Sequence, residues 1–277
     1  MSEELSSRPI GIFDSGMGGL TVMRALMAKL PNESFVYLGD TARLPYGTKS
    51  ADTVSRYAVQ AANMLLRRNV KLLVIACNTA SAMALPVLEA MLAPTPVVGV
   101  IGPGAEAAVA AAHGKAIAII ATEGTVRGGA YLRAIHARAP EAEVVQQACP
   151  LFVSLAEEGL IAGDIAELVA EHYLGPLFAN ADPATLVLGC THFPVMAPML
   201  ETVIARLGKQ VMLVDSAQTT ADAVSHLLAK NTLARMDEGS PSHVFLSTDS
   251  PERFARVGEI FLGRAPDAVE LVDLRQV

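Results

Sequence analysis

The chain has 277 residues, of which 52% are apolar and 5% aromatic, and it carries a net charge of −7 at pH 7. This length suffices for two lobes of α/β structure, and the acidic balance without a basic run argues against nucleic acid as a ligand. Because the first ten residues are polar and acidic, and no apolar run approaches the ~20 residues of a membrane-spanning helix, we expect a cytoplasmic protein without membrane contact.

The N-terminal part of the sequence predicts strands that alternate with helices. Strands are expected at 9–13, 34–38 and 72–75, and helices at 20–30 and 53–68. A glycine-rich turn at 14–19 joins the first strand to its helix, but Thr21 stands where a dinucleotide fingerprint needs its third glycine. The turn is therefore either a tight connection or a carboxylate-binding turn. The loop after the second strand carries Pro45, Tyr46 and Gly47, and such loops concentrate site residues.

Two predicted strands end at a cysteine. The strand at 72–75 leads to Cys77, and a strand that begins at Leu186 leads to Cys190. Short polar or ionisable side chains follow both cysteines, namely Asn78, Thr79, Thr191 and His192. One such cysteine is typical of an ordinary buried residue. Because ligands bind beyond the carboxyl ends of parallel strands, the matched pair indicates two functional thiols.

The second half of the chain repeats the scheme of the first. Further strands are expected at 94–101, 115–121, 143–147, 186–188, 211–214, 243–248 and 269–274, and further helices at 105–113, 151–160, 165–179, 219–230 and 251–263. The segment 116–124 echoes 10–16, and the Cys190 segment echoes the Cys77 segment in the same order. The pattern predicts a duplicated α/β unit.

The segment Gly102-Pro103-Gly104 marks the expected crossing between the two units. We predict two pseudo-symmetric α/β domains with mainly parallel sheets and an active site in the cleft between them. Residues 1–98 with 211–277 are expected to form the first, discontinuous domain, and residues 99–210 the second. Three cysteines without CxxC spacing argue against a disulfide framework or a structural zinc site. Cys149 lacks the polar residues that follow the other two and is interpreted as structural.

Two thiols on opposite walls of one cleft suit proton transfer. A thiolate can take a proton from a ligand, and a thiol on the far side can give one back, which inverts a carbon centre. A hydrolase with a nucleophilic cysteine needs one thiol and an orienting histidine. The second copy of the cysteine segment argues against a hydrolase.

Five motifs together resemble the glutamate racemases, a family of cofactor-independent amino-acid racemases. They are IGIFDSGMGG, YLGDTARLPYG, IACNTASA, LGCTHFP and VDSA, and they span residues 9–217. The resemblance implies interconversion of L- and D-glutamate by two cysteines, supply of D-glutamate to peptidoglycan, no cofactor or metal, and frequently a homodimer. The tail from residue 242 carries no motif of the family.

The resemblance also implies site residues. Substrate contacts carry over to Asp14, Ser15, Pro45, Tyr46, Gly47, Cys77, Asn78, Thr79, Cys190, Thr191 and His192. Asp14 assists Cys77 and His192 assists Cys190, although His192 could instead serve packing. The acid in the family pattern aligns best with Glu157, while the adjacent Glu158 stays an alternative. By resemblance, Cys77 takes the proton from D-glutamate and Cys190 from L-glutamate.

Two other functions stay open at this point. A related racemase with the same two thiols could act on aspartate or a hydantoin. A protein of another class, a two-lobed amino-acid-binding protein without catalysis, would use the same cleft. Nothing in the sequence identifies a further role such as inhibition of DNA gyrase.

Overall fold

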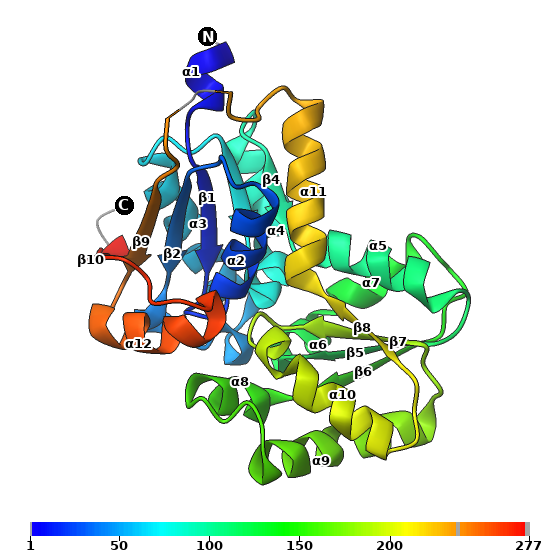
Figure 1. The fold of residues 1–277 in the computed structure, drawn as a ribbon. Coiled ribbons are helices and arrows are strands. Elements are labelled where there is room, and N and C mark those ends of the chain that lie inside the picture. The colour runs from blue at the N-terminus through cyan, green and yellow to red at the C-terminus, as the bar shows by residue number, and fades with distance from the viewer. Residues whose placement is uncertain (1, 237–238, 275–277) are drawn as a thin grey trace.

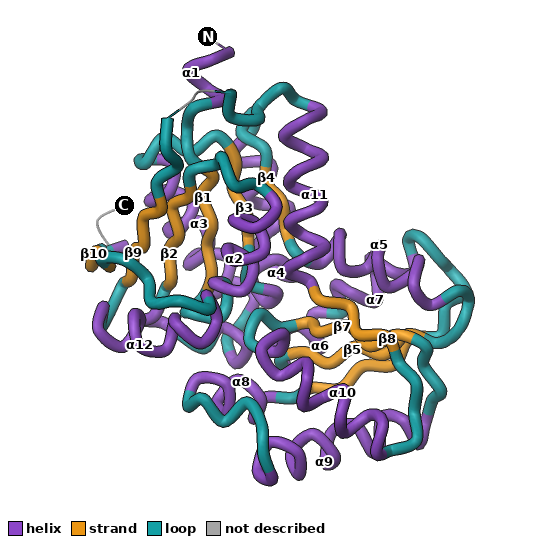
Figure 2. Tube along the Cα trace, in the orientation of Figure 1, coloured by secondary structure: helices purple, strands orange, loops and turns teal. Residues whose placement is uncertain are grey.

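A computed structural model describes residues 2–236 and 239–274, which form two parallel β-sheets with helices on both faces (Figures 1 and 2). The strands of the first sheet are β1 (Ile10–Asp14), β2 (Phe35–Gly39), β3 (Leu72–Ile75), β4 (Val97–Gly99), β9 (His243–Ser247) and β10 (Val269–Leu271). Those of the second are β5 (Ile117–Ala121), β6 (Val144–Ala148), β7 (Thr185–Gly189) and β8 (Met212–Asp215). The predicted fold class, α/β with two parallel sheets, is confirmed.

The two sheets share one strand order. The second sheet runs β6-β5-β7-β8, and the strands β2-β1-β3-β4 of the first sheet follow the same order. The first sheet continues with β9 and β10 beyond β2. Because β3 and β7 hold the same place in this order, Cys77 and Cys190 follow equivalent strands of a repeated unit.

Helices cover each sheet. The first sheet with α2 (Leu20–Lys29), α3 (Ala51–Leu66), α4 (Asn78–Leu92), α11 (Ser216–Lys230) and α12 (Pro251–Leu262) is called the first lobe. The second sheet with α5 (Ile101–Ala112), α6 (Glu123–Gly128), α7 (Ala130–His136), α8 (Pro150–Glu157), α9 (Asp164–Asn180) and α10 (Ala197–Arg206) is called the second lobe. A short helix, α1 (Ser2–Ser6), precedes β1. No helix in the described ranges is long and apolar enough to cross a membrane.

Burial explains why these segments form strands. All residues of β1, β2, β3, β5 and β7 are buried. Strands covered by helices on both faces need continuous apolar runs, because neither face meets water. The run Leu72–Ile75 satisfies this, and the chain then turns into α4 at Cys77.

Two expectations about the crossing between lobes differ from the structure. Because α5 begins at Ile101, the segment Gly102-Pro103-Gly104 lies in its first turn and not in a loop before the helix. Proline is tolerated there, since the first N–H groups of a helix have no partner within it. Strand β8 pairs with β7 in the second sheet, so this sheet extends past the expected boundary at residues 210 and 211.

Candidate active site

A cavity lies between the two lobes. It is lined from the first lobe by Ser15, Gly16, Leu44, Pro45, Tyr46, Gly47, Cys77, Asn78 and Thr79, and from the second by Thr122, Val153, Glu157, Cys190, Thr191 and His192. The structure thus brings together every predicted site residue except Asp14, which is buried and is not among the lining residues. Both cysteines are 95% buried, with 5% of each residue exposed.

Cys77 is held at the junction of β3 and α4. It is the N-cap of α4, where its Sγ accepts a hydrogen bond from the Ala80 N–H across 3.5 Å. Its thiol donates to Ser15 Oγ at the same distance. Burial and the nearby Asp14 carboxylate raise the pKa of Cys77 to about 12. Cys77 therefore keeps its proton at neutral pH.

Asp14 ends β1 and accepts hydrogen bonds from both lobes. The Gly16 N–H donates to Oδ2 across 2.9 Å, and the Thr191 hydroxyl donates to Oδ1 across 3.4 Å. Burial raises the pKa of Asp14, and the nearby His192 and backbone N–H groups partly oppose this rise. The carboxyl group thus ties the glycine-rich turn to the Cys190 segment.

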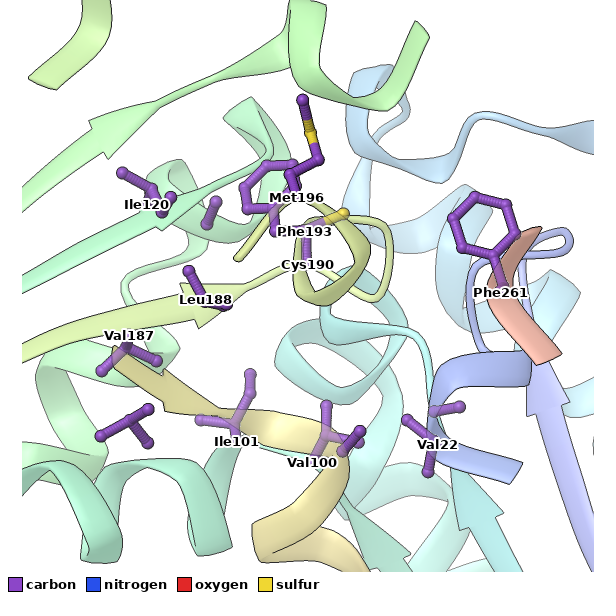
Figure 3. Close-up of a cluster of buried hydrophobic side chains, with 14 of the residues drawn as sticks. Val22, Val100, Ile101, Ile120, Val187, Leu188, Cys190, Phe193, Met196 and Phe261 are labelled. Carbon is purple, nitrogen blue, oxygen red and sulfur yellow. The ribbon is translucent and has the colours of Figure 1, made fainter. Parts of the chain in front are cut away.

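Cys190 follows β7 and lies beside Phe193 and Met196 (Figure 3). Its Sγ is 3.7 Å from His192 Nδ1, and His192 Nε2 is 3.2 Å from Glu157 Oε1. Burial lowers the pKa of His192, but the hydrogen bonds to Cys190 and Glu157 outweigh it and raise the pKa to about 10. His192 is therefore a cation at neutral pH and can donate to the sulfur.

The tail of the chain contacts one lining residue on this side of the cavity. Arg253 in α12 donates to Glu157 Oε2 across 3.0 Å, so a residue of the first lobe pairs with one of the second. Burial raises the pKa of Glu157, but hydrogen bonds from His192 and Arg253 lower it below its ordinary value. Glu157 lines the cavity and Glu158 is exposed. Because the tail matches no motif, Arg253 could not be predicted from the sequence.

The loop after β2 forms another part of the wall. The Tyr46 hydroxyl is hydrogen-bonded to the buried carboxylate of Asp40, and Arg43 Nε donates to the same carboxylate across 2.7 Å. Gly47 packs against the second lobe, since a Cβ added to it would lie 2.9 Å from Thr122 Cβ. Thr122 was not predicted, although it follows β5 as Ser15 follows β1, and the echo of 10–16 in 116–124 points to it.

Asn78 and Thr79 face the second lobe from the start of α4. The hydroxyl of Thr79 is 3.0 Å from that of Thr122, and Asn78 Oδ1 accepts a hydrogen bond from the Tyr131 hydroxyl.

Cys149 is fully buried outside the cavity lining, and its thiol donates to Gln147 O. No group of three His, Cys, Asp or Glu residues in the described part of the chain could hold a metal ion.

Comparison with known proteins identifies the family of the chain. The sequence model described as Asp/Glu/Hydantoin racemase matches residues 16–224. The chain belongs to the Asp/Glu/Hydantoin racemase family. As a member of this family it is similar to glutamate racemases from Geobacter metallireducens (49% identity, covering 92% of this chain and 93% of the relative) and Neisseria meningitidis (46%, covering 96% and 97%).

A solved structure of a family member agrees with the fold. Glutamate racemase from Francisella tularensis, in complex with D-glutamate, superimposes with a TM-score of 0.91 at 39% identity. The match covers 98% of this chain and 100% of that one. The similarity therefore includes both lobes of this racemase-family chain and its tail.

The close approach of the lobes at Gly18 predicts loss of activity on substitution. A Cβ at this position would lie 2.5 Å from Thr191 Oγ1 and would also overlap the His192 ring. Gly18→Ala should lower kcat/KM for racemisation by at least roughly tenfold, because misplacing a catalytic group by about 1 Å can cost 100-fold. Gly102→Ala is the matched control, since a Cβ at Gly102 meets open space. Equal activity of the two variants would contradict the prediction.

The raised pKa of His192 predicts a pH-dependent stability. A histidine whose folded pKa lies near 10 stabilises the fold fully below its unfolded value of ~6.5, and this contribution is lost as the pH rises toward 10. The free energy of unfolding, measured by urea titration from pH 6 to 10, should therefore fall less steeply in Glu157→Gln than in the parent. Glu158→Gln should keep the parent slope, and identical slopes in all three proteins would refute this explanation.

Proposed function

We propose that this chain is a glutamate racemase that interconverts L- and D-glutamate by proton transfer between two thiols. One observation carries the proposal, namely that Cys77 and Cys190 follow equivalent strands of a repeated unit and line one cavity from opposite lobes. The similarity to glutamate racemases at 46–49% identity supports glutamate as the substrate. Family membership by itself would also allow other substrates.

The two thiols have different surroundings that suit one direction of the reaction. With L-glutamate bound, Cys190 takes the α-proton, and the electron pair left on the α-carbon then takes the proton of Cys77 from the opposite face. The high pKa of Cys77 keeps that proton in place until the carbanion forms. The His192 cation, paired with Glu157, donates to the Cys190 sulfur. The reverse reaction starts with the protonation states of the two thiols exchanged.

The remaining lining residues suit a ligand with two carboxylates and one ammonium. Ser15, Asn78, Thr79 and Thr191 offer hydroxyl and amide donors, while Pro45, Tyr46 and Gly47 shape the wall. Asp14 holds the glycine-rich turn and Thr191 beside the cavity. The reaction consists only of proton transfers by the chain's own side chains, so this function includes no cofactor or metal.

The proposed function includes a cellular role and an assembly. D-glutamate made by the enzyme supplies peptidoglycan synthesis in the cytoplasm, as the resemblance to glutamate racemases implies. We also propose a homodimer. Four large apolar side chains are exposed on or beside α8 and α9 and support a protein contact there: Leu151, Leu160, Ile165 and Leu168.

Replacing one thiol at a time tests the mechanism. Cys77→Ala and Cys190→Ala should each reduce racemisation of glutamate by roughly 100- to 10,000-fold in both directions, because every turnover uses both groups. A glutamate analogue with a leaving group on the β-carbon needs only proton abstraction. Cys77→Ala should still eliminate from the L-analogue and Cys190→Ala from the D-analogue, while Cys149→Ala is the control with parent activity.

Several results would overturn the proposal. If either variant racemised glutamate near the parent rate, two-thiol catalysis would be excluded. If both variants eliminated from the same enantiomer of the analogue, the assignment of one thiol to each enantiomer would be excluded. Circular dichroism of single enantiomers would show the substrate, and decay confined to aspartate would replace glutamate with aspartate. Binding of glutamate without any change of handedness over hours would indicate a binding protein.

A further inference from the structure

A hydrogen bond between Tyr131 and Asn78 joins the two lobes beside the cavity. Tyr131 belongs to α7 of the second lobe and is completely buried. Its hydroxyl donates to Asn78 Oδ1 across 2.8 Å. Asn78 begins α4 of the first lobe, is 3% exposed and lines the cavity. Tyr131 itself does not line the cavity, and Asn78 is the lining residue to which its hydroxyl is hydrogen-bonded.

Two glycines leave room for the Tyr131 ring. A Cβ added at Gly104 in α5 would lie 3.3 Å from the Tyr131 hydroxyl, and one added at Gly189 in β7 would lie 3.1 Å from the ring. Real Cβ atoms seldom approach other atoms this closely. The ring is therefore packed tightly between a helix and a strand, and its hydroxyl has little freedom to leave Asn78.

The other end of the Asn78 amide has no protein partner. Its Nδ2 is buried and makes no hydrogen bond within the described residues. Among the buried side-chain atoms of these residues that lack a partner, Asn78 Nδ2 is the one that belongs to a cavity-lining residue. Buried amide donors are almost always hydrogen-bonded, because an unpaired one costs free energy. An acceptor on a bound ligand would supply the missing partner.

The geometry points to Tyr131 as a positioning residue that fixes the orientation of the Asn78 amide. With Oδ1 held by the tyrosine, Nδ2 is the end presented to a ligand, and it donates to a carboxylate of glutamate. Without the hydroxyl, the amide can turn by half a rotation and present Oδ1 to the carboxylate, which repels it. This inference rests on the proposed racemase function, since that function supplies the carboxylate.

A double-mutant cycle tests the inference. Asn78→Ala removes a hydrogen bond to a charged group and should raise KM for glutamate roughly 10- to 100-fold. Tyr131→Phe should raise KM about three- to tenfold and change kcat by less than about twofold, because it disturbs binding and not the thiols. In the Asn78→Ala background, Tyr131→Phe should raise KM no further, since the amide it orients is absent.

Tyr173→Phe is the matched control. Tyr173 is also a largely buried tyrosine of the second lobe, and its hydroxyl accepts from the Leu151 N–H outside the cavity lining. The KM of the Tyr173→Phe variant for glutamate should equal that of the parent. Thermal unfolding of each variant shows whether the variant is folded.

The outcomes separate this inference from the proposed function. If Tyr131→Phe raises KM by the same factor with and without Asn78, or leaves KM unchanged in the parent, the positioning role is wrong while the racemase function stands. If Tyr131→Phe does not fold, an unchanged KM in Asn78→Ala would still overturn the inference, and a raised KM would support it. Absence of racemisation by the parent protein would instead refute the proposed function.

Discussion

The site depends on how closely the two lobes approach each other. The backbone of Gly18 leaves no room for a side chain against Thr191 and His192, and Gly124 lies so near Gly47 O that an added Cβ would be only 2.7 Å away. These contacts come from the turns that follow β1 and β5 and from the loop beyond β2. Because glycine lacks a Cβ, the backbones can meet and carry the two thiols to the walls of one cavity. The rest of the site is arranged around this approach.

The repeated strand order supplies two similar walls, and the sequence then makes them chemically different. The Cys77 wall is neutral at the sulfur, where a serine hydroxyl and a helix N–H surround a buried thiol. The Cys190 wall has charge, because the His192 ring lies between the sulfur and a carboxylate that also binds Arg253. A repeated fold thus places two thiols at comparable positions in different surroundings, and the surroundings of Cys77 hold its proton in place.

Sequence alone could predict those parts of the site that are marked by a pattern within a few consecutive residues. A buried strand followed by a cysteine and polar capping residues predicts the ends of β3 and β7, because this pattern is complete within a few residues. Arg253 and Tyr131 carry no such signal, since their partners Glu157 and Asn78 lie 96 and 53 positions away in the chain. The same limit explains β8, whose apolar run predicts a strand but cannot tell which sheet it joins. The predicted second domain therefore ended before β8, although this strand belongs to the second sheet.

The proposed mechanism requires two different groups that exchange protons with the two faces of one carbon. Racemisation of L-glutamate in deuterium oxide, stopped while little product has formed, tests it most directly by mass spectrometry of the separated enantiomers. In the proposed mechanism one thiol removes the α-proton and the other delivers a solvent-derived one, so deuterium should appear at the α-carbon of D-glutamate and be almost absent from the remaining L-glutamate. Deuterium in the remaining L-glutamate at the same early times as in the product would contradict it, because a single base can return a solvent proton to either face.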